Sequence, residues 1–382
     1  MKNFIIIPDS FKGTMSSLEI CNIMAESVKR FFCDANILCI PVADGGEGTV
    51  DAFLSAVGGT KIDINVCGPF NDVVPSFYGI LSGAAKDGEK TAVIEMAACA
   101  GLPLAEGRLN PECSTTFGVG ELIKSALDKG CSKIITGLGG SATNDGACGA
   151  ASALGVRFFD KSGNTFVPTG GSLKDICRID TSGIDPRLKD AQLISMCDID
   201  NPLCGKTGAA YIFGPQKGAS HPMVKRLDSG LKHLAEIVQH DMLLEDAAEI
   251  PGAGAAGGMG FGMKIFFGSK LQMGIETVLD TVQFDKLLKN ADIVFSGEGK
   301  IDTQSLRGKV VIGIARRTKK AGVPLFAVVG DIGDNIESAY TEGVSAIFSI
   351  NRVAIPFIEA RRRAKTDLAL TMDTIMRVIN IR

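Results

Sequence analysis

Residues 3–42 read NFIIIPDSFKGTMSSLEICNIMAESVKRFFCDANILCIPV, and this stretch decides the fold. The apolar runs at residues 4–8 and 37–42 predict two short β-strands. Between them, Ser16 followed three residues later by Glu19 is a helix start signal. Apolar side chains then recur at helical spacing: Cys21, Met24, Ala25, Val28, Phe31 and Phe32. We therefore expect a helix that packs on a sheet between two of its strands.

The same alternation continues along the chain and indicates an α/β fold with parallel sheets. Further β-rich runs lie at residues 134–136, 192–197, 293–296, 325–329 and 346–350. The first ~70 and last ~90 residues read as units of the doubly wound type, whereas the middle is richer in glycine. We predict one α/β domain from residues 1–70 and 290–382, with residues 71–289 inserted as a second. Two consecutive domains would give much the same periodicity and stay an alternative.

Size and charge narrow the class of function. A chain of 382 residues exceeds the roughly 250 to 300 at which one core stops growing, so a site in the cleft between two domains is expected. A net charge of −3 without a basic block argues against nucleic acid and membrane partners. Neither a secretory signal nor a run of about 18 apolar residues is present. We expect a cytoplasmic protein that acts on small molecules, with a homodimer as one candidate assembly.

Cysteines and histidines point away from disulfide, zinc and triad chemistry. The 11 cysteines are scattered and lie mostly in apolar runs, as expected of buried free thiols. All 3 histidines fall within residues 221–240, which argues against a His-based site. Carboxylates, lysines and backbone amides are left to carry the chemistry.

Polar loops follow the first two predicted strands. Asp9, Ser10 and Lys12 lie where doubly wound sheets bind ligands, although a solvated turn explains them equally well. Asp44 and Glu47 share a loop with three glycines. Two acids so close together favour a cation such as Mg²⁺ or a lysine, and a plain glycine turn is the weaker alternative.

A glycine-rich loop follows the strand at residues 134–136. Its sequence, TGLGGSATNDG at residues 136–146, resembles in kind the phosphate loops of small-metabolite kinases. Successive backbone amides and a hydroxyl can hold a nucleotide phosphate there, with a purely structural loop as the alternative. The expected cofactor-binding residues are Gly137, Gly139, Gly140, Ser141, Thr143 and Asn144.

Acids mark two later strand ends. Asp198 is placed either to accept the proton of a substrate hydroxyl or to hold Mg²⁺, and an Asp-Asn-Pro turn also explains it. Glu298 and Asp302 follow the run at residues 293–296. The charged loops thus gather at one end of the strands, as expected of an active-site edge.

Two other stretches imitate nucleotide motifs. Residues 205–207 look like the end of a Walker A loop, but Asp200 stands where its first glycine belongs. Residues 252–257 match the dinucleotide fingerprint without a convincing strand before them. Because of this match, an NAD-dependent hydroxy-acid dehydrogenase stays the main alternative enzyme class. A non-catalytic binding protein is the third candidate function.

Six stretches stand out when they are read together: residues 8–12 (PDSFK), 41–50 (PVADGGEGTV), 139–146 (GGSATNDG), 213–219 (FGPQKGA), 251–260 (PGAGAAGGMG) and 297–302 (GEGKID). In this order, and over essentially the whole chain, they resemble the bacterial glycerate kinase family, of the type that phosphorylates D-glycerate to 2-phosphoglycerate. The resemblance implies dependence on ATP and Mg²⁺, and a flavodoxin/Rossmann-like parallel sheet interrupted by an inserted α/β domain. Asp200, an extra acid beside Asp198, departs from the family pattern.

The chain is accordingly expected to transfer the γ-phosphoryl group of ATP to D-glycerate. Side-chain chemistry suggests the roles. Lys12 would neutralise charge on the transferred group, and Asp198 would activate the hydroxyl. The expected substrate ligands are Asp9, Ser10, Asp302 and Lys217, the last pairing with the carboxylate. The expected Mg²⁺ ligands are Asp44, Glu47 and Glu298, with binding of glycerate hydroxyls as the alternative role of these acids.

Overall fold

A computed structural model describes residues 1–82, 89–244, 246–303 and 305–381. The chain divides into two compact units. Unit 1 contains Met1–Ala43, Asp51–Val57 and Met273–Arg382, and unit 2 contains Asp44–Val50 and Gly58–Gln272. The boundaries of these units differ from those of the expected domains, which were residues 1–70 with 290–382 and residues 71–289. The expected domain boundaries stay a prediction.

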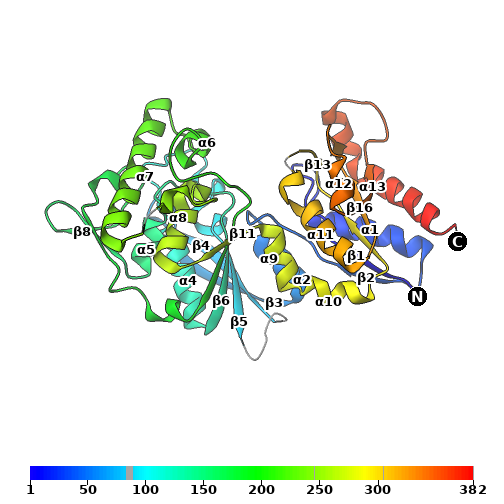
Figure 1. The fold of residues 1–382 in the computed structure, drawn as a ribbon, viewed down its shortest axis with the longest axis horizontal. Coiled ribbons are helices and arrows are strands. Elements are labelled where there is room, and N and C mark those ends of the chain that lie inside the picture. Colours follow the sequence, from blue (N-terminus) through cyan, green and yellow to red (C-terminus); the bar gives the residue numbers. More distant parts are fainter. Residues whose placement is uncertain (83–88, 245, 304, 382) are drawn as a thin grey trace. The chain divides into compact units, whose positions relative to one another are not determined.

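Unit 1 is built on a five-stranded parallel sheet (Figure 1). In spatial order its strands are β2 (Asn36–Cys39), β1 (Asn3–Ile6), β12 (Ile293–Ser296), β14 (Leu325–Val329) and β16 (Val344–Ser349). If the five strands are numbered in the order in which they occur along the chain, their spatial order is that of flavodoxin-like sheets. The direction of winding reverses between β1 and β12, so the loops after these two strands flank the place where such sheets bind ligands.

The helices of unit 1 begin with the one that the sequence predicts. They are α1 (Ser17–Phe31), α2 (Thr49–Val57, shared with unit 2), α9 (Gly274–Thr281), α10 (Phe284–Leu287), α11 (Val310–Ala321), α12 (Ser338–Glu342) and α13 (Phe357–Ile379). The capping box is confirmed, since the Ser16 hydroxyl accepts from the N–H of Glu19 at 3.2 Å and the Glu19 carboxylate accepts from the N–H of Ser16 at 2.9 Å. α1 and α13 pack together over a core that joins Phe4 with Met24 and Leu368.

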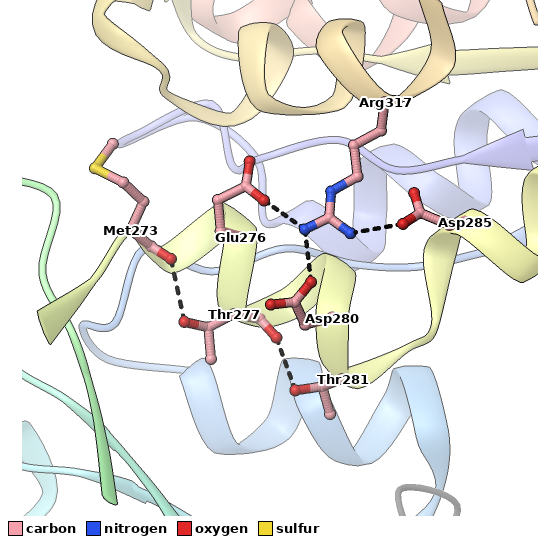
Figure 2. A network of polar contacts seen from close by, with 7 residues as sticks. All are labelled: Met273, Glu276, Thr277, Asp280, Thr281, Asp285 and Arg317. Atoms are coloured by element: carbon pink, nitrogen blue, oxygen red, sulfur yellow. Dashed lines mark hydrogen bonds and ion pairs between the residues drawn. The ribbon is translucent and has the colours of Figure 1, made fainter. Parts of the chain in front are cut away.

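A branched ion-pair network ties α11 to α9 and α10 (Figure 2). The guanidinium of Arg317 donates to Glu276 and, at 2.6 Å, to Asp280, both on α9. It also donates to Asp285 of α10 at 3.2 Å. The Arg317 side chain is only 19% exposed, whereas the side chains of Asp280 and Asp285 are 52% and 71% exposed. The guanidinium of Arg317 therefore holds three helices of unit 1 against one another.

Unit 2 is built on a six-stranded mixed sheet (Figure 1). In spatial order its strands are β11 (Lys270–Gln272), β10 (Gln192–Met196), β6 (Cys131–Gly137), β5 (Lys90–Glu95), β4 (Val73–Leu81) and β3 (Gly59–Cys67). The first four run parallel, whereas β5, β4 and β3 pair antiparallel. The strands predicted in this unit, at residues 134–136 and 192–197, lie in the parallel part of the sheet as expected, whereas β3 and β4 were not predicted. β3 and β4 are joined by only residues 68–72, and a connection this short allows only antiparallel pairing.

Helices and small sheets complete the two units. The helices of unit 2 are α3 (Ala97–Ala100), α4 (Phe117–Asp128), α5 (Cys148–Ala153), α6 (Ala209–Phe213), α7 (His221–Met242) and α8 (Ala255–Phe267). Small sheets are formed by β7 (Arg157–Phe159), β8 (Thr165–Phe166) and β9 (Arg178–Asp180) in unit 2 and by β13 (Lys300–Ile301) and β15 (Asp331–Ile332) in unit 1.

The cysteines are free, as expected, although Cys33, Cys113 and Cys177 are exposed rather than buried. No helix within the described ranges is long and apolar enough to cross a membrane.

Candidate functional site

The loops after β1 and β12 lie side by side at the edge of the unit 1 sheet. The N–H of Asp9 donates to the carbonyl of Gly297 at 2.8 Å, which continues the pairing of the two strands past their ends. Gly297 has no room for a side chain, because a Cβ there would lie 2.1 Å from the carbonyl oxygen of Val328. This packing brings Asp9 and Glu298 close enough to influence each other's charge, with Lys12 on the same loop as Asp9.

Glu298 is a buried carboxyl group beside other acids. It is 6% exposed, and its Oε1 atom has no hydrogen-bond partner among the described residues. Burial raises the pKa of Glu298 to about 7. The charges of Asp9 and Asp302 raise it further, whereas a hydrogen bond from Ser305 and the charge of Lys309 lower it. A carboxyl group in this environment is stabilised by any cation or donor that reaches it.

Replacing Glu298 by glutamine is expected to stabilise the metal-free protein above neutral pH. The folded-state pKa of about 7 exceeds the ordinary value of 4.5, so the contribution of Glu298 to folding is complete below that ordinary value and is lost as pH rises through 7. The amide cannot ionise. The unfolding free energy of the Glu298→Gln variant should exceed that of the unchanged protein by close to zero at about pH 4 and by on the order of 2 to 3 kcal/mol at about pH 8.

Urea unfolding of both proteins in EDTA at these two pH values measures the effect of the Glu298 substitution. Glu337→Gln, at an exposed position of the same unit, is the matched control and should give the same small difference at both pH values. A gain from Glu298→Gln that does not grow with pH would contradict the raised pKa.

A pocket of about 190 Å³ opens beside Lys12 in unit 1. Its walls include Gly299 after β12, Gly330 after β14 and Asn351 after β16, so it lies at the carboxyl ends of the strands. The rule that ligands bind at these ends could have identified Asn351 from the sequence. Arg361, a further wall residue, lies on α13 and carried no such signal.

The predicted substrate ligands belong to both units. Asp9, Ser10 and Asp302 lie in unit 1, and Lys217 lies in unit 2. The carboxylate of Asp9 accepts from the N–H of Ser10 at 2.7 Å, and that of Asp302 accepts from the N–H of Ser305 at 3.3 Å. These bonds fix the acids at the ends of their strands, and their substrate-binding roles stay predictions.

In unit 2 the two predicted glycine-rich loops pack against each other. The N–H of Gly139 donates to the carbonyl of Gly45 at 2.9 Å. A Cβ on Gly137 would lie 2.3 Å from that carbonyl oxygen, so no side chain fits there. The contact brings Asp44 to residues 137–146, hereafter the glycine loop, and both contribute to one pocket of about 210 Å³.

The glycine loop presents donors that the protein itself does not use. No hydrogen bond to a described residue is made by the N–H groups of Gly140, Ser141, Thr143 and Asn144. Asn144 is fully buried, and neither polar atom of its side chain has a partner in the described chain. Buried polar groups of this kind are costly unless a ligand or water satisfies them. The arrangement suits a phosphate, whose oxygens accept from several N–H groups at once.

The far end of the glycine loop is anchored by buried contacts. The carboxylate of Asp145 accepts from the N–H and the hydroxyl of Thr116 at 2.7 and 2.9 Å. Burial raises the pKa of Asp145, and these hydrogen bonds oppose the rise. Gly257, with φ of +73°, lies so close that a Cβ would be 2.1 Å from the carbonyl oxygen of Thr143. The stretch at residues 252–257 that imitates a dinucleotide motif thus packs against the glycine loop.

Lys217 lies under the glycine loop as a buried amine. It ends the short 3-10 helix Pro215–Lys217 and is 1% exposed. Its Nζ donates to the Ser141 hydroxyl at 2.8 Å and to the Thr143 carbonyl at 2.6 Å. Burial lowers the pKa of Lys217 to about 7, while the charge of Asp145 opposes that fall. Pairing of Lys217 with a substrate carboxylate stays a prediction.

The acids predicted to bind Mg²⁺ belong to different units. Asp44 and Glu47 lie in unit 2, and Glu298 lies in unit 1. Within the described ranges, no three or more histidine, cysteine, aspartate or glutamate residues form a cluster that could hold a metal ion. Asp44 and Asp198 nevertheless line the same pocket as the glycine loop. Mg²⁺ usually takes one or two carboxylates and completes its shell with phosphate oxygens and water, so this pair fits the ion.

Known proteins are similar to this chain along its whole length. The model of the glycerate kinase family matches residues 4–380. A glycerate kinase of Bacillus cereus is 43% identical over 378 residues, 99% of this chain and 98% of the relative. A glycerate 2-kinase of Escherichia coli is 43% identical over 382 residues, 98% of each chain. A crystal structure from Salmonella typhimurium, described as a glycerate kinase 2, is 38% identical with a TM-score of 0.86, covering 99% of this chain and 98% of that one.

Proposed function

Because this chain belongs to the glycerate kinase family, we propose that it transfers the γ-phosphoryl group of ATP to the 2-hydroxyl of D-glycerate, giving 2-phosphoglycerate and ADP. The observation that carries the proposal is the glycine loop, since Gly140 and Ser141, whose N–H groups are unused, line one pocket with Asp44 and Asp198. The name of the Escherichia coli relative favours the 2-hydroxyl. The proposed setting is the cytoplasm, with ATP and D-glycerate as partners.

The glycine loop is the proposed binding site of the ATP phosphates. Gly137 and Gly139 keep the backbone free of side chains where it approaches the ligand. Gly140, Ser141, Thr143 and Asn144 supply N–H donors. Phosphoryl transfer depends mainly on positioning and charge neutralisation, and preorganised donors provide both.

The remaining roles follow from side-chain chemistry. Asp198 accepts the proton of the attacking hydroxyl, because a carboxylate can only accept. Lys12 neutralises charge on the transferred group, as a mobile ammonium group can. Asp9, Ser10 and Asp302 are the proposed ligands of the glycerate hydroxyls.

Mg²⁺, when bound, would neutralise charge on the phosphate oxygens. Asp44, Glu47 and Glu298 are the proposed ligands, and Asp198 is the alternative that shares a pocket with Asp44. Asp44 also holds its own loop in place. Asp44 does so through the N–H of Gly46, which donates to it at 3.3 Å.

No observation favours the dehydrogenase alternative. Its sequence support was the stretch at residues 252–257, which packs through Gly257 against Thr143 of the glycine loop. A dinucleotide motif instead needs its glycines beside a pyrophosphate at a helix N-terminus after a strand. The glycines of this stretch are explained by close backbone packing.

The proposed activity is tested by following ADP release from ATP and Mg²⁺ with and without D-glycerate. We expect ADP to form at a rate that depends on D-glycerate. Glycerate binding without ADP release would support a non-catalytic binding protein, and saturable binding of NADH would revive the dehydrogenase; either result contradicts the proposal.

A further inference from the structure

The polar core beneath the glycine loop contains an amine that donates only to neutral acceptors. In the described chain, the hydrogen-bond partners of Lys217 Nζ are the Ser141 hydroxyl and the Thr143 carbonyl, at 2.8 and 2.6 Å. At 1% exposure the amine is shielded from water. A buried ammonium group without a bonded acid is costly, so its presence needs a reason that an apolar side chain could not supply.

The contact with Ser141 fixes the direction of its hydroxyl proton. When Lys217 is protonated its ammonium group only donates, so the Ser141 oxygen accepts from it and the single proton of Ser141 points elsewhere. Ser141 and Lys217 both line the pocket of about 210 Å³. The hydroxyl proton is therefore available to a ligand in this pocket, which Gly140 and Ser141, with their unused N–H groups, also line.

The contact with Thr143 orients the backbone in the same way. In a trans peptide the C=O and the following N–H point in opposite directions. Holding the Thr143 carbonyl toward Lys217 therefore turns the N–H of Asn144 away from the amine. This N–H has no acceptor among the described residues. One amine thus orients two donors of the glycine loop.

We infer that Lys217 is a positioning residue, which holds Ser141 and the Thr143–Asn144 peptide as donors to the ATP phosphates; this role replaces the predicted pairing of Lys217 with the carboxylate of glycerate. The inference rests on the proposed function, which assigns phosphates to this loop. When it is protonated, the buried amine also attracts an anion more strongly than an exposed lysine would, because little water screens its charge.

Replacing Lys217 by methionine tests the inference, since Met keeps an unbranched side chain and removes both hydrogen bonds. We expect the KM for ATP, and the Kd of a non-hydrolysable ATP analogue with Mg²⁺, to rise about 10- to 100-fold. The KM for D-glycerate should change less than about threefold. Lys217→Gln, whose amide can still donate, should retain more affinity and serves as the test protein if the methionine variant does not fold.

Lys90→Met is the matched control. Lys90 also donates to a backbone carbonyl, that of Lys129 at 3.2 Å, but it is exposed at the start of β5. Both KM values should be unchanged in this variant.

A double-mutant cycle with Ser141→Ala tests whether Lys217 acts through Ser141. We expect Lys217→Met to weaken analogue binding much less in the Ser141→Ala background. Additive effects, unchanged analogue binding, or a rise confined to the KM for D-glycerate would overturn the inference, the last by showing direct contact with the carboxylate. Analogue binding is measured without glycerate and is therefore independent of the acceptor. If Lys217 and Ser141 are coupled in analogue binding but the protein releases no ADP with glycerate, the proposed function is refuted and the inference stands.

Discussion

Replacing Asp198 by asparagine is expected to lower kcat by about 10²- to 10⁴-fold while the protein stays folded. Asp198 follows β10 and lines the same pocket as the glycine loop and Asp44. Asparagine keeps the size of the side chain but cannot accept the hydroxyl proton or bind a cation with a full negative charge. The large loss follows because both proposed roles of Asp198 depend on that charge.

Initial rates at saturating ATP and D-glycerate measure the loss at Asp198. Asp200→Asn is the matched control, because Asp200 lies two positions away on the same loop, is exposed and does not line the pocket. A near-normal rate for Asp198→Asn would reject its role. A larger loss for Asp200→Asn would transfer that role to its neighbour.

Replacing Lys12 by alanine is expected to lower kcat by about 10²- to 10³-fold, because an interaction with developing charge counts most in the transition state. Lys12 lies on the loop after β1, at the reversal point of the unit 1 sheet, and lines the pocket there. The binding of glycerate should weaken far less than the rate falls.

The measurement for Lys12 is kcat and both KM values, with thermal unfolding as a check on folding. Lys320→Ala, an exposed lysine at the end of α11 in the same unit, is the control and should behave like the unchanged protein. A rise in KM with kcat unchanged would show that Lys12 only binds substrate and would contradict its role in the transfer step.

Local sequence signals predicted the local structure well. The Ser16 and Glu19 box formed as expected because it depends on side chains one helical turn apart. Polar residues after the strands, such as Asp9 and Asp198, lie at carboxyl ends because parallel strands all end at the same edge. The glycine loop was identified for a related reason, since its glycines and hydroxyls are contiguous in sequence.

Features that depend on distant contacts were missed. Nothing near Lys217 shows that its amine is buried under residues 141–143, which lie more than 70 positions earlier. The raised pKa of Glu298 likewise depends on its burial in the folded unit and, to a smaller extent, on the charge of Asp9, which the pairing of β1 with β12 brings near from almost 290 positions away. The antiparallel edge of unit 2 was missed for a different reason, because β3 and β4 follow each other through the short connection at residues 68–72 and do not alternate with helices.

The central claim, transfer to the 2-hydroxyl of D-glycerate, is tested most directly by its product. The protein is incubated with D-glycerate, ATP and Mg²⁺, and phosphoenolpyruvate is measured directly after addition of enolase, with and without phosphoglycerate mutase. We expect phosphoenolpyruvate to form without the mutase, because enolase accepts only the 2-phosphate. Phosphoenolpyruvate that forms only when the mutase is present would place the attack at the 3-hydroxyl and contradict the claim.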